Sequence, residues 1–508
     1  MAQATADTIA ASETLIVEAG TGTGKTFAYL MPALQSGKKI IISTGTRHLQ
    51  DQLFGKDLPV VRDALHAPVR AALLKGRANY LCWHRMGTAA SDGRRLSGRQ
   101  LNELEDIRSW SARTASGDIA ELGAVPEDSI VWPRVTSTVE NCLGQECEFF
   151  QDCFVVKARR LALEADIVVI NHHLLFADMV LKEEGFGELL PGADAFIIDE
   201  AHQLPEVASL FFGATLSSHQ LRDLVRDTRL EHVREAGDMQ DLPESADRLE
   251  AVTHQLRLAL GQTDRRAAWS AVSDDPALQQ ALLQLSSCLQ QLSDWLVVAA
   301  ERGTGLESCR ARAVMLKQRL ALLMKHSSIE YIHWFETFRT SFRLNLTPLN
   351  VAPIFRNCME NLSSAWVFTS ATLAVGSSFD HFTAQLGLEG ARQLQLDSPF
   401  DYPNNALLYL PDNMPAPNER FYVDAVVACA RDVLQASAGR AFILFTSHSA
   451  LQAAASQLAD TLDYPLLVQG TAPRRELLER FRELGNAVLL GTGSFWEGVD
   501  VRGAALSC

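Results

Sequence analysis

Short runs of apolar residues, each followed by small or polar residues, mark both ends of the chain as regions of predicted strands. The run at residues 14–18 (TLIVE) is short and rich in β-branched side chains, which predicts a buried strand. Similar runs lie at residues 38–44, 166–172, 195–198 and 365–370, and a second set lies at 440–447, 464–470 and 486–493. We therefore predict two successive α/β units, each with its own sheet.

The interval between residues 202 and 369 has a helical pattern and little strand character. Between residues 276 and 296, leucines recur in alternating steps of four and three, at Leu278, Leu282, Leu285, Leu289, Leu292 and Leu296. Asp275 is a natural N-cap for this helix, and Pro276 suits its first turn. A second helix, with Leu316, Leu320 and Leu323, follows the glycines at 303 and 305. We expect a helical domain packed largely on itself, with the leucines as its core.

The composition is that of a globular protein with several domains. The 508 residues are 47% hydrophobic and 21% charged, and at about 150 residues per domain they suffice for roughly three or four domains. There is no signal peptide and no run of about 18 apolar residues, so we expect no membrane contact and a cytoplasmic location. The net charge of −15 argues against a passive coat on nucleic acid, but not against a local grip on phosphates.

A glycine-rich segment follows the first predicted strand and precedes a helical stretch. Its residues are Ala19, Gly20, Thr21, Gly22, Thr23, Gly24, Lys25 and Thr26. Glycines in such a loop let successive backbone N–H groups turn toward a phosphate at the N-terminus of the helix. Lys25 would neutralise the β- and γ-phosphates of ATP, and the Thr26 hydroxyl would contact Mg²⁺. Ala19 stands where this motif usually has glycine, and its small side chain still permits close approach.

An acidic pair follows the strand predicted at residues 195–198. Asp199 and Glu200 stand where a parallel strand ends, beside the crevice in which α/β sheets bind ligands. Asp199 would hold the Mg²⁺ shell, and Glu200 would polarise the attacking water. Two interpretations of His202 stay open: it couples the nucleotide site to the next motif, or it only satisfies a local hydrogen bond.

These motifs and others follow one another in an order that resembles superfamily 2 helicases of the XPD/DinG group, most closely the bacterial YoaA type. The segments that carry the resemblance are EAGTGTGKT (18–26), STGTRHLQDQL (43–53), VINHHLL (169–175), DEAH (199–202), TSATL (369–373), DSPF (397–400), FTSHSAL (445–451) and GTGSFWEGVDVRG (491–503). The resemblance implies ATP-driven 5′→3′ movement on single-stranded and forked DNA. It also implies work in DNA repair or replication, together with protein partners that the sequence does not identify.

The same resemblance implies the architecture of the chain. The fold class would be α/β, with two RecA-like P-loop lobes that hold ATP between them. An iron–sulfur cluster insertion and a helical arch-like insertion would interrupt the first lobe. We expect the first lobe at residues 1–75, 166–205 and 350–390, the cluster domain at 76–165, the arch-like domain at 206–349, and the second lobe, incomplete, at 391–508.

Four of the nine cysteines lie close together in the sequence, and we expect the five single ones to be ordinary buried side chains. The spacing is Cys82-x59-Cys142-x4-Cys147-x5-Cys153. One remote and three close cysteines suit an iron–sulfur cluster better than a structural zinc site, which usually has two close pairs. The segments KGRANYLC and NCLGQECEFFQDC resemble the cluster domain of the family, which implies a [4Fe–4S] cluster. Zinc and four metal-free buried cysteines stay open as alternatives.

Several residues that follow predicted strands are candidates for contact with DNA, and hydroxyls there would hold phosphates without reading bases. They are Thr44, Thr46 and Arg47 in the first lobe, and Thr446, Ser447 and Trp496 in the second. Phe495 and Trp496 would either stack on bases or pack in a core. Basic side chains of the cluster domain would either face DNA or form an ordinary solvated surface; they are Arg77, Arg85, Lys157, Arg159 and Arg160. The resemblance further implies that His202, Ser370, Thr372, Glu497 and Asp500 couple DNA binding to ATP hydrolysis.

Two segments that the family carries are missing from the sequence. One is an arginine-bearing motif after residue 503, and the other is an adenine-contacting segment before the first strand. We therefore expect a fragment of a longer protein. Because such an arginine contributes about 10³–10⁵ in rate, a chain that binds ATP and single-stranded DNA without unwinding is one alternative. An RNA helicase and a translocase that does not unwind are the others.

Overall fold

The computed structural model describes residues 1–91, 97–126, 129–183, 189–325, 330–459, 461–496, 499, 501 and 503–508. The chain divides into two compact units. The first consists of Met1–Glu121 and Ile130–Ser398, and the second consists of Leu122–Ser129 and Pro399–Cys508. Among the helices in these ranges, none is both long enough and apolar enough to span a membrane.

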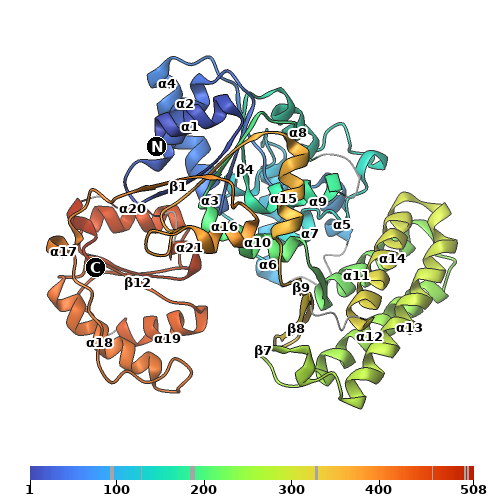
Figure 1. Ribbon diagram of the computed structural model, residues 1–508. Helices are drawn as coiled ribbons and strands as arrows, with labels where there is room; N and C mark the ends of the chain where they lie inside the picture. Colours follow the sequence, from blue (N-terminus) through green and yellow to red (C-terminus); the bar gives the residue numbers. More distant parts are fainter. Residues whose placement is uncertain are drawn as a thin grey trace. The chain divides into compact units, whose positions relative to one another are not determined.

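A parallel sheet of seven strands forms the centre of the first unit (Figure 1). In spatial order the strands are β11 (Arg392–Leu396), β1 (Thr14–Ala19), β10 (Ala365–Ser370), β5 (Ala195–Asp199), β2 (Ile40–Thr44), β4 (Ile167–Asn171) and β3 (Ala71–Leu73). The five strands predicted from apolar runs are confirmed, whereas β3 and β11 were not predicted. Because β11 pairs with β1, the first sheet extends past residue 390, where we expected the second lobe to begin.

Helices cover both faces of this sheet. On one face α1 (Ala2–Ala11), α2 (Lys25–Gln35) and α4 (Leu58–Leu65) bury apolar residues of five strands. The other face is aromatic: Phe196 of β5 and Trp366 of β10 stack with ring centroids 4.3 Å apart. Phe355 of α15 (Ala352–Leu362) packs against Trp366 at 6.3 Å and against Phe176 of α9 (His172–Glu183) at 5.7 Å. Strands buried on both faces explain why the apolar runs are nearly continuous.

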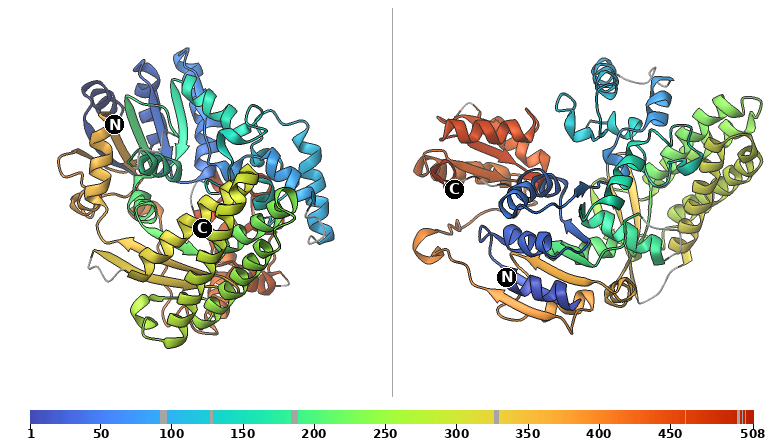
Figure 2. Two further views of the ribbon diagram at one scale, coloured as in Figure 1. Left: turned by 90° about the vertical axis from the view of Figure 1, so that its right-hand side faces the viewer. Right: turned by 90° about the horizontal axis from the view of Figure 1, so that it is seen from above.

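The long insertion after β5 contains a bundle of four helices that lie side by side (Figures 1 and 2). They are α11 (Ser218–Glu235), α12 (Asp241–Ala259), α13 (Pro276–Ala299) and α14 (Thr304–Lys325). The predicted leucine helix is confirmed as α13, and Asp275 caps it by accepting a hydrogen bond from Ala277 N at 2.8 Å. All six leucines of the stripe are buried, so they form the bundle core.

The expectation that this insertion is helical was incomplete, because it also contains an antiparallel sheet. Its strands, in spatial order, are β6 (Ala214–Ser217), β9 (Phe342–Pro348), β8 (Tyr331–Thr337) and β7 (Arg265–Ala268). Residues of β8 alternate between the bundle core, where Phe335 is buried, and an outer face that carries Ile332, Trp334 and Glu336. Polar residues interrupt these strands, which therefore lack the continuous apolar run that identified the parallel strands.

Short helices make up the segment that carries the four clustered cysteines. They are α5 (Trp83–Ser91), α6 (Gly98–Ser111), α7 (Trp132–Val135) and α8 (Phe154–Glu164). A buried ion network joins this segment to the bundle: Arg85 of α5 and Arg312 of α14 both bind Asp227 of α11, at 2.9 and 2.7 Å. Arg85 therefore belongs neither to a DNA-facing side nor to a solvated face.

The second unit has a parallel sheet in the order β12 (Ala441–Leu444), β14 (Val488–Gly491) and β13 (Leu466–Val468), which confirms the second set of predicted strands. Helices α18 (Tyr422–Ala436) and α19 (His448–Leu458) cover one face, and α20 (Arg474–Leu484) covers the other (Figure 1). The remaining α-helices among the described residues are α3 (Arg47–Gln52), α10 (Leu204–Phe211), α16 (Asp380–Leu386), α17 (Tyr402–Asn405) and α21 (Gly493–Trp496).

A buried histidine makes the stability of the first unit depend on pH. His172 begins α9, is fully buried, and its Nδ1 lies 2.8 Å from Ser43 Oγ of β2. Burial lowers the pKa of His172 to about 3, from an ordinary value of 6.5. Below pH 6.5 the unfolded chain binds this proton and the folded chain does not, so stability is lost as pH falls from about 6.5 toward 3, by up to ~1.4 kcal/mol per unit.

We expect His172→Gln to flatten the dependence of the unfolding free energy on pH between 7 and 5. Urea unfolding at several pH values measures this slope. The matched control is His254→Gln, because His254 is exposed on α12 and its removal should leave the slope of the wild-type chain unchanged. Equal slopes for all three proteins would show that His172 is not the group that titrates.

Candidate functional site

The glycine-rich loop connects the end of β1 to the start of α2. Gly24 has φ of +86° and Gly22 has φ of +71°, a region that side-chain-bearing residues rarely adopt. Within the loop, Thr23 Oγ1 and Lys25 Nζ both donate to the carbonyl oxygen of Gly20, at 2.7 and 3.2 Å. The first turn of α2 therefore presents free backbone N–H groups beside a lysine, which is an arrangement suited to a phosphate chain.

Asp199 lies at the carboxyl end of β5 and is buried. The hydroxyl of Tyr29, one turn along α2 from Lys25, donates to Asp199 Oδ2 at 3.1 Å and also bonds the Thr26 side chain. Burial, reinforced by the neighbouring Glu200, raises the pKa of Asp199 to about 7, although Tyr29 and Lys25 oppose the increase. The structure thus brings the loop and the acidic pair together.

Tyr29 was not predicted as a site residue from the sequence. The available signal was its position in the helix, three residues after Thr26 and four after Lys25, which places it on the same helical face as these two residues. A tyrosine hydroxyl buried on that face requires a polar partner, and Asp199 supplies it.

Three residues from two motifs meet just beyond Asp199. His202 Nδ1 lies 2.8 Å from Ser370 Oγ, at the end of β10, and 3.4 Å from Glu200 Oε2. Glu200 has φ of +55°, a strained conformation for a residue with a side chain, and such strain is often kept at functional sites. Thr372, in contrast, has an exposed side chain, and its backbone N–H donates to Ser370 Oγ at 3.4 Å.

Glu18 links the same edge of the sheet to the segment after β10. Its carboxylate accepts hydrogen bonds from the backbone N–H groups of Leu373, at 2.5 Å, and Ala374, at 2.6 Å. Burial alone would raise the pKa of Glu18, but these N–H groups and Gln395 hold it below the ordinary value. Glu18 was part of a recognised motif, but nothing local in the sequence shows that it holds the residues after Thr372.

The four clustered cysteines are each half-buried and lie near one another. Burial raises the pKa of the Cys82 thiol to about 11, with smaller contributions from Cys142 and Cys147. Burial also raises the pKa of Cys147, with smaller contributions from Cys142 and Cys153. Within the described part of the chain, no three His, Cys, Asp or Glu residues are arranged at metal-binding distances. The side chains therefore converge without the closed geometry of a metal site.

Two of the five basic residues expected at a DNA-facing or solvated surface face these thiols instead. Arg77 Nη1 donates to Cys142 Sγ at 2.7 Å. Burial, and then the nearby Arg77, lower the pKa of Arg159, which also lies close to Cys142 and Cys153. Lys157 and Arg160 are exposed on α8. Of the five single cysteines, Cys309 and Cys358 are buried as expected, Cys288 and Cys429 are half-buried, and Cys508 is exposed.

The candidates for DNA contact in the first unit differ in accessibility. Thr44 is the last residue of β2, where it pairs with Asn171 of β4, and it is fully buried. The expectation that Thr44 contacts DNA was therefore wrong. Thr46 caps α3, accepting from Leu49 N at 3.3 Å, and Arg47 is exposed at the start of that helix.

The candidates in the second unit lie after β12 and in α21. Thr446 and Ser447 are exposed, and Ser447 caps α19 by accepting from Ala450 N at 3.2 Å. Phe495 is buried and packs in the core, which is one of the two alternatives considered for it. Trp496, in contrast, is 56% exposed. Glu497 and Asp500 lie outside the described residues.

A phosphate loop and an acidic pair with a buried aspartate, at the carboxyl edge of a parallel sheet, define the first unit as a P-loop nucleotide-hydrolysing domain of the helicase class. Two protein families match the chain: DEAD/DEAH box helicases over residues 1–76, and the helicase C-terminal domain over residues 430–508.

Comparison with individual proteins narrows the class. The chain is 46% identical to the ATP-dependent DNA helicase YoaA of Escherichia coli, over 100% of its own length and 80% of that protein. It is 32% identical to the ATP-dependent helicase DinG of Mycobacterium tuberculosis, over 100% of this chain and 79% of that one. Among solved structures the chain is similar to Xpd4 of Sulfolobus tokodaii, with 13% identity and a TM-score of 0.49. The match covers 96% of this chain and 79% of that one. The chain belongs to the YoaA and DinG family of ATP-dependent helicases.

The buried charge of Asp199 predicts opposite effects of one substitution on stability and activity. Because the pKa of Asp199 is raised to about 7, its ionisation destabilises the nucleotide-free fold increasingly as pH rises from about 4 toward 7. Asp199→Asn should therefore raise the melting temperature at pH 8 by about 2–4 °C. ATP hydrolysis should fall to background.

Thermal unfolding at pH 5 and pH 8, with a phosphate-release assay, measures both effects. The gain in melting temperature should be smaller at pH 5, where the carboxyl group is mostly protonated. Asp463→Asn, at an exposed position of the second unit, is the control and should change neither quantity. A gain of equal size at both pH values would exclude burial of charge as its cause.

Proposed function

We propose that this chain is an ATP-dependent DNA helicase that moves 5′→3′ on single-stranded DNA and opens forked DNA. The observation that carries the proposal is the convergence of the phosphate loop, Asp199, Glu200 and the His202–Ser370 contact at adjacent strand ends of one sheet. Membership of a family whose relatives are named as DNA helicases supports DNA over RNA as the substrate. A role in repair or replication, with protein partners, agrees with this activity.

Each residue at this edge has a proposed role in hydrolysis. The loop N–H groups from Gly20 to Gly24 cradle the phosphates, and Lys25 neutralises the charge that develops on them. Thr26 and Asp199 would hold Mg²⁺, which supplies further charge neutralisation when bound. Tyr29 positions Asp199 by its hydrogen bond. Glu200, held in its strained conformation, polarises the attacking water.

The contact between His202 and Ser370 suits a role in coupling. His202 belongs to the acidic motif, and Ser370 begins the segment that continues through Thr372 to the backbone groups held by Glu18. A change at Glu200 therefore reaches residues 370–374 through side chains in direct contact. We infer that this route, together with Glu497 and Asp500, links hydrolysis to the grip on DNA.

Cys82, Cys142, Cys147 and Cys153 would hold a [4Fe–4S] cluster. The donor set fits, because each of the four thiols lies within electrostatic range of at least one other and no other ligand type is needed. Arg77 fits as well, since a guanidinium that donates to a ligand sulfur stabilises its anionic form. A cluster of this kind, when bound, would organise the short helices of its segment.

Contact with DNA is proposed for exposed or half-buried residues only. Thr46 and Arg47 lie at the N-terminus of α3, and Thr446 and Ser447 lie at the N-terminus of α19. Helix N-termini with hydroxyl caps bind phosphates without regard to sequence. Trp496 is exposed enough to stack on a base.

Steady-state ATP hydrolysis with and without single-stranded DNA tests the proposed function. We expect strong stimulation by DNA in anaerobically purified protein, and its loss in Lys25→Ala because the phosphates lose their principal cation. Strand separation on a fork with a 5′ tail, compared with a 3′ tail, tests polarity. A folded chain that binds DNA but shows no turnover would sink the helicase proposal and leave a binding protein; stronger stimulation by RNA would indicate an RNA helicase.

Substitution of one clustered cysteine tests the proposed cluster. Cys142→Ser should abolish bound iron and the visible absorbance of the purified protein, because one of four ligands and the partner of Arg77 are lost together. Cys288→Ser, at a half-buried single cysteine of α13, should retain both. Purified wild-type protein with zinc in place of iron, or with neither metal, would contradict the assignment.

A further inference from the structure

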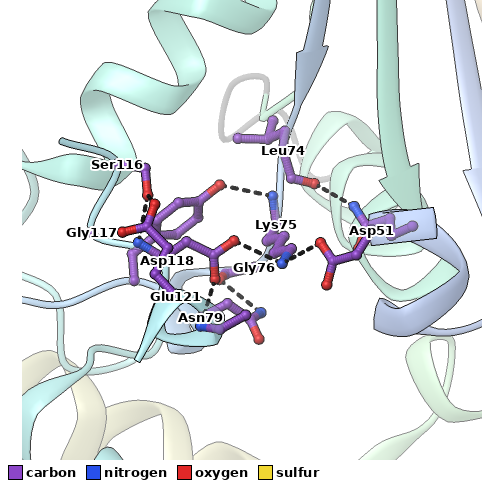
Figure 3. Close-up of polar contacts among 12 residues, drawn as sticks. Asp51, Leu74, Lys75, Gly76, Asn79, Ser116, Gly117, Asp118 and Glu121 are labelled. Carbon is purple, nitrogen blue, oxygen red and sulfur yellow. Dashed lines mark hydrogen bonds and ion pairs between the residues drawn. The ribbon is translucent and has the colours of Figure 1, made fainter. Parts of the chain in front are cut away.

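A buried lysine outside the nucleotide site lies between two acidic side chains that are far apart in the sequence. The side chain of Lys75, just after β3, is only 2% exposed. Its Nζ lies 2.6 Å from Asp51 Oδ1 and 2.7 Å from Asp118 Oδ2 (Figure 3). Burial opposes the charge, but the two carboxylates outweigh it and raise the pKa of Lys75. The ammonium group is therefore charged and held from both sides.

One end of this bridge is α3, the short helix that starts at Arg47. Asp51 lies in its last turn, and the preceding Gln50 is fully buried with its Nε2 donating to the carbonyl oxygen of Leu74 at 2.9 Å. Two consecutive residues of α3 thus hold residues 74 and 75. α3 continues through a π-helical turn (Leu53–Asp57) into α4, and these contacts hold the N-terminal part of that helical run against residues 74 and 75.

The other end is a loop that packs on the cysteine segment. Next to Asp118, the carbonyl oxygen of Gly117 accepts from Leu81 N at 2.9 Å, directly before Cys82. Gly117 has φ of +67°, and a Cβ there would lie 2.2 Å from the ring of Phe154, so the loop fits closely against the residue after Cys153. Glu121 braces the loop from within by accepting from Thr114 and Ser116 (Figure 3).

We propose that Lys75 is a positioning residue that ties α3 to the cysteine segment, so that DNA contact by Thr46 and Arg47 depends on this bridge. The inference rests on the proposed function, because it concerns the grip on single-stranded DNA. A lysine suits the position, since a compact ammonium with three donors can meet carboxylates from two directions. Loss of either carboxylate leaves the other ion pair in place but removes the ionic bridge between the two segments.

Asp118→Asn is the decisive variant, because residue 118 lies outside α3 and the Lys75–Asp51 pair remains. We expect the concentration of single-stranded oligonucleotide at half-maximal ATPase activity to rise about five- to tenfold, with kcat at saturating DNA unchanged within about twofold. Amide hydrogen exchange of Arg47–Gln52 should become faster. Asp51→Asn removes the other ion pair and should raise the half-saturating DNA concentration by a similar factor. The double variant should raise this concentration no further than either single variant.

Lys75→Met removes both ion pairs and should reproduce these effects with a lower melting temperature, whereas Lys56→Met, at an exposed lysine, should be silent. Wild-type values of half-saturating DNA and of exchange in α3 for Asp118→Asn would overturn the inference. A fall in kcat with unchanged half-saturation would overturn it too. Failure of the proposed function looks different, because DNA would then not stimulate the wild-type chain at all.

Discussion

The parallel pairing of β1, β10 and β5 is the constraint on which the rest of the first unit depends. Because the three strands are adjacent and run in one direction, their carboxyl ends meet at one edge, where Glu18 is level with Ser370 and Thr369 with Asp199. Residues about 350 positions apart thereby become neighbours. The aromatic stack of Phe196 and Trp366 favours this register, since a slip by one residue would move a ring to the opposite face of the sheet, which is packed with aliphatic side chains.

Buried charges with partners from distant segments form the second level of organisation. Asp199 has Tyr29 and Lys25, Asp227 has Arg85 and Arg312, and Lys75 has Asp51 and Asp118. Breaking one such pair leaves an uncompensated charge, which costs far more than the pair itself contributes. These networks therefore specify the packing of the sheet, the cysteine segment and the helical bundle more than they add to stability.

Expectations from the sequence failed where an element's surroundings decided the outcome. Thr44 and Thr46 both lie near the end of β2, but Thr44 is the last residue of that strand and is fully buried. Arg85 stands in a basic stretch, yet it points to Asp227 because the bundle packs there. The strands β7, β8 and β9 escaped notice because polar residues interrupt their apolar positions, and β11 pairs with β1 beyond the expected boundary at residue 390.

The sequence by itself determined the elements whose signals are local: the buried parallel strands, the leucine helix with its cap at Asp275, the phosphate loop and the acidic pair. Each of these needs particular residue types at fixed spacing, so the chemistry can be deduced without coordinates. Only the tertiary structure decided the partners of Tyr29, Glu18, Arg77 and Lys75. Their contacts join residues from 24 positions apart, for Lys75 and Asp51, to 377 positions apart, for Glu18 and Gln395, and no local pattern encodes which buried donor will meet which acceptor once the sheet is assembled.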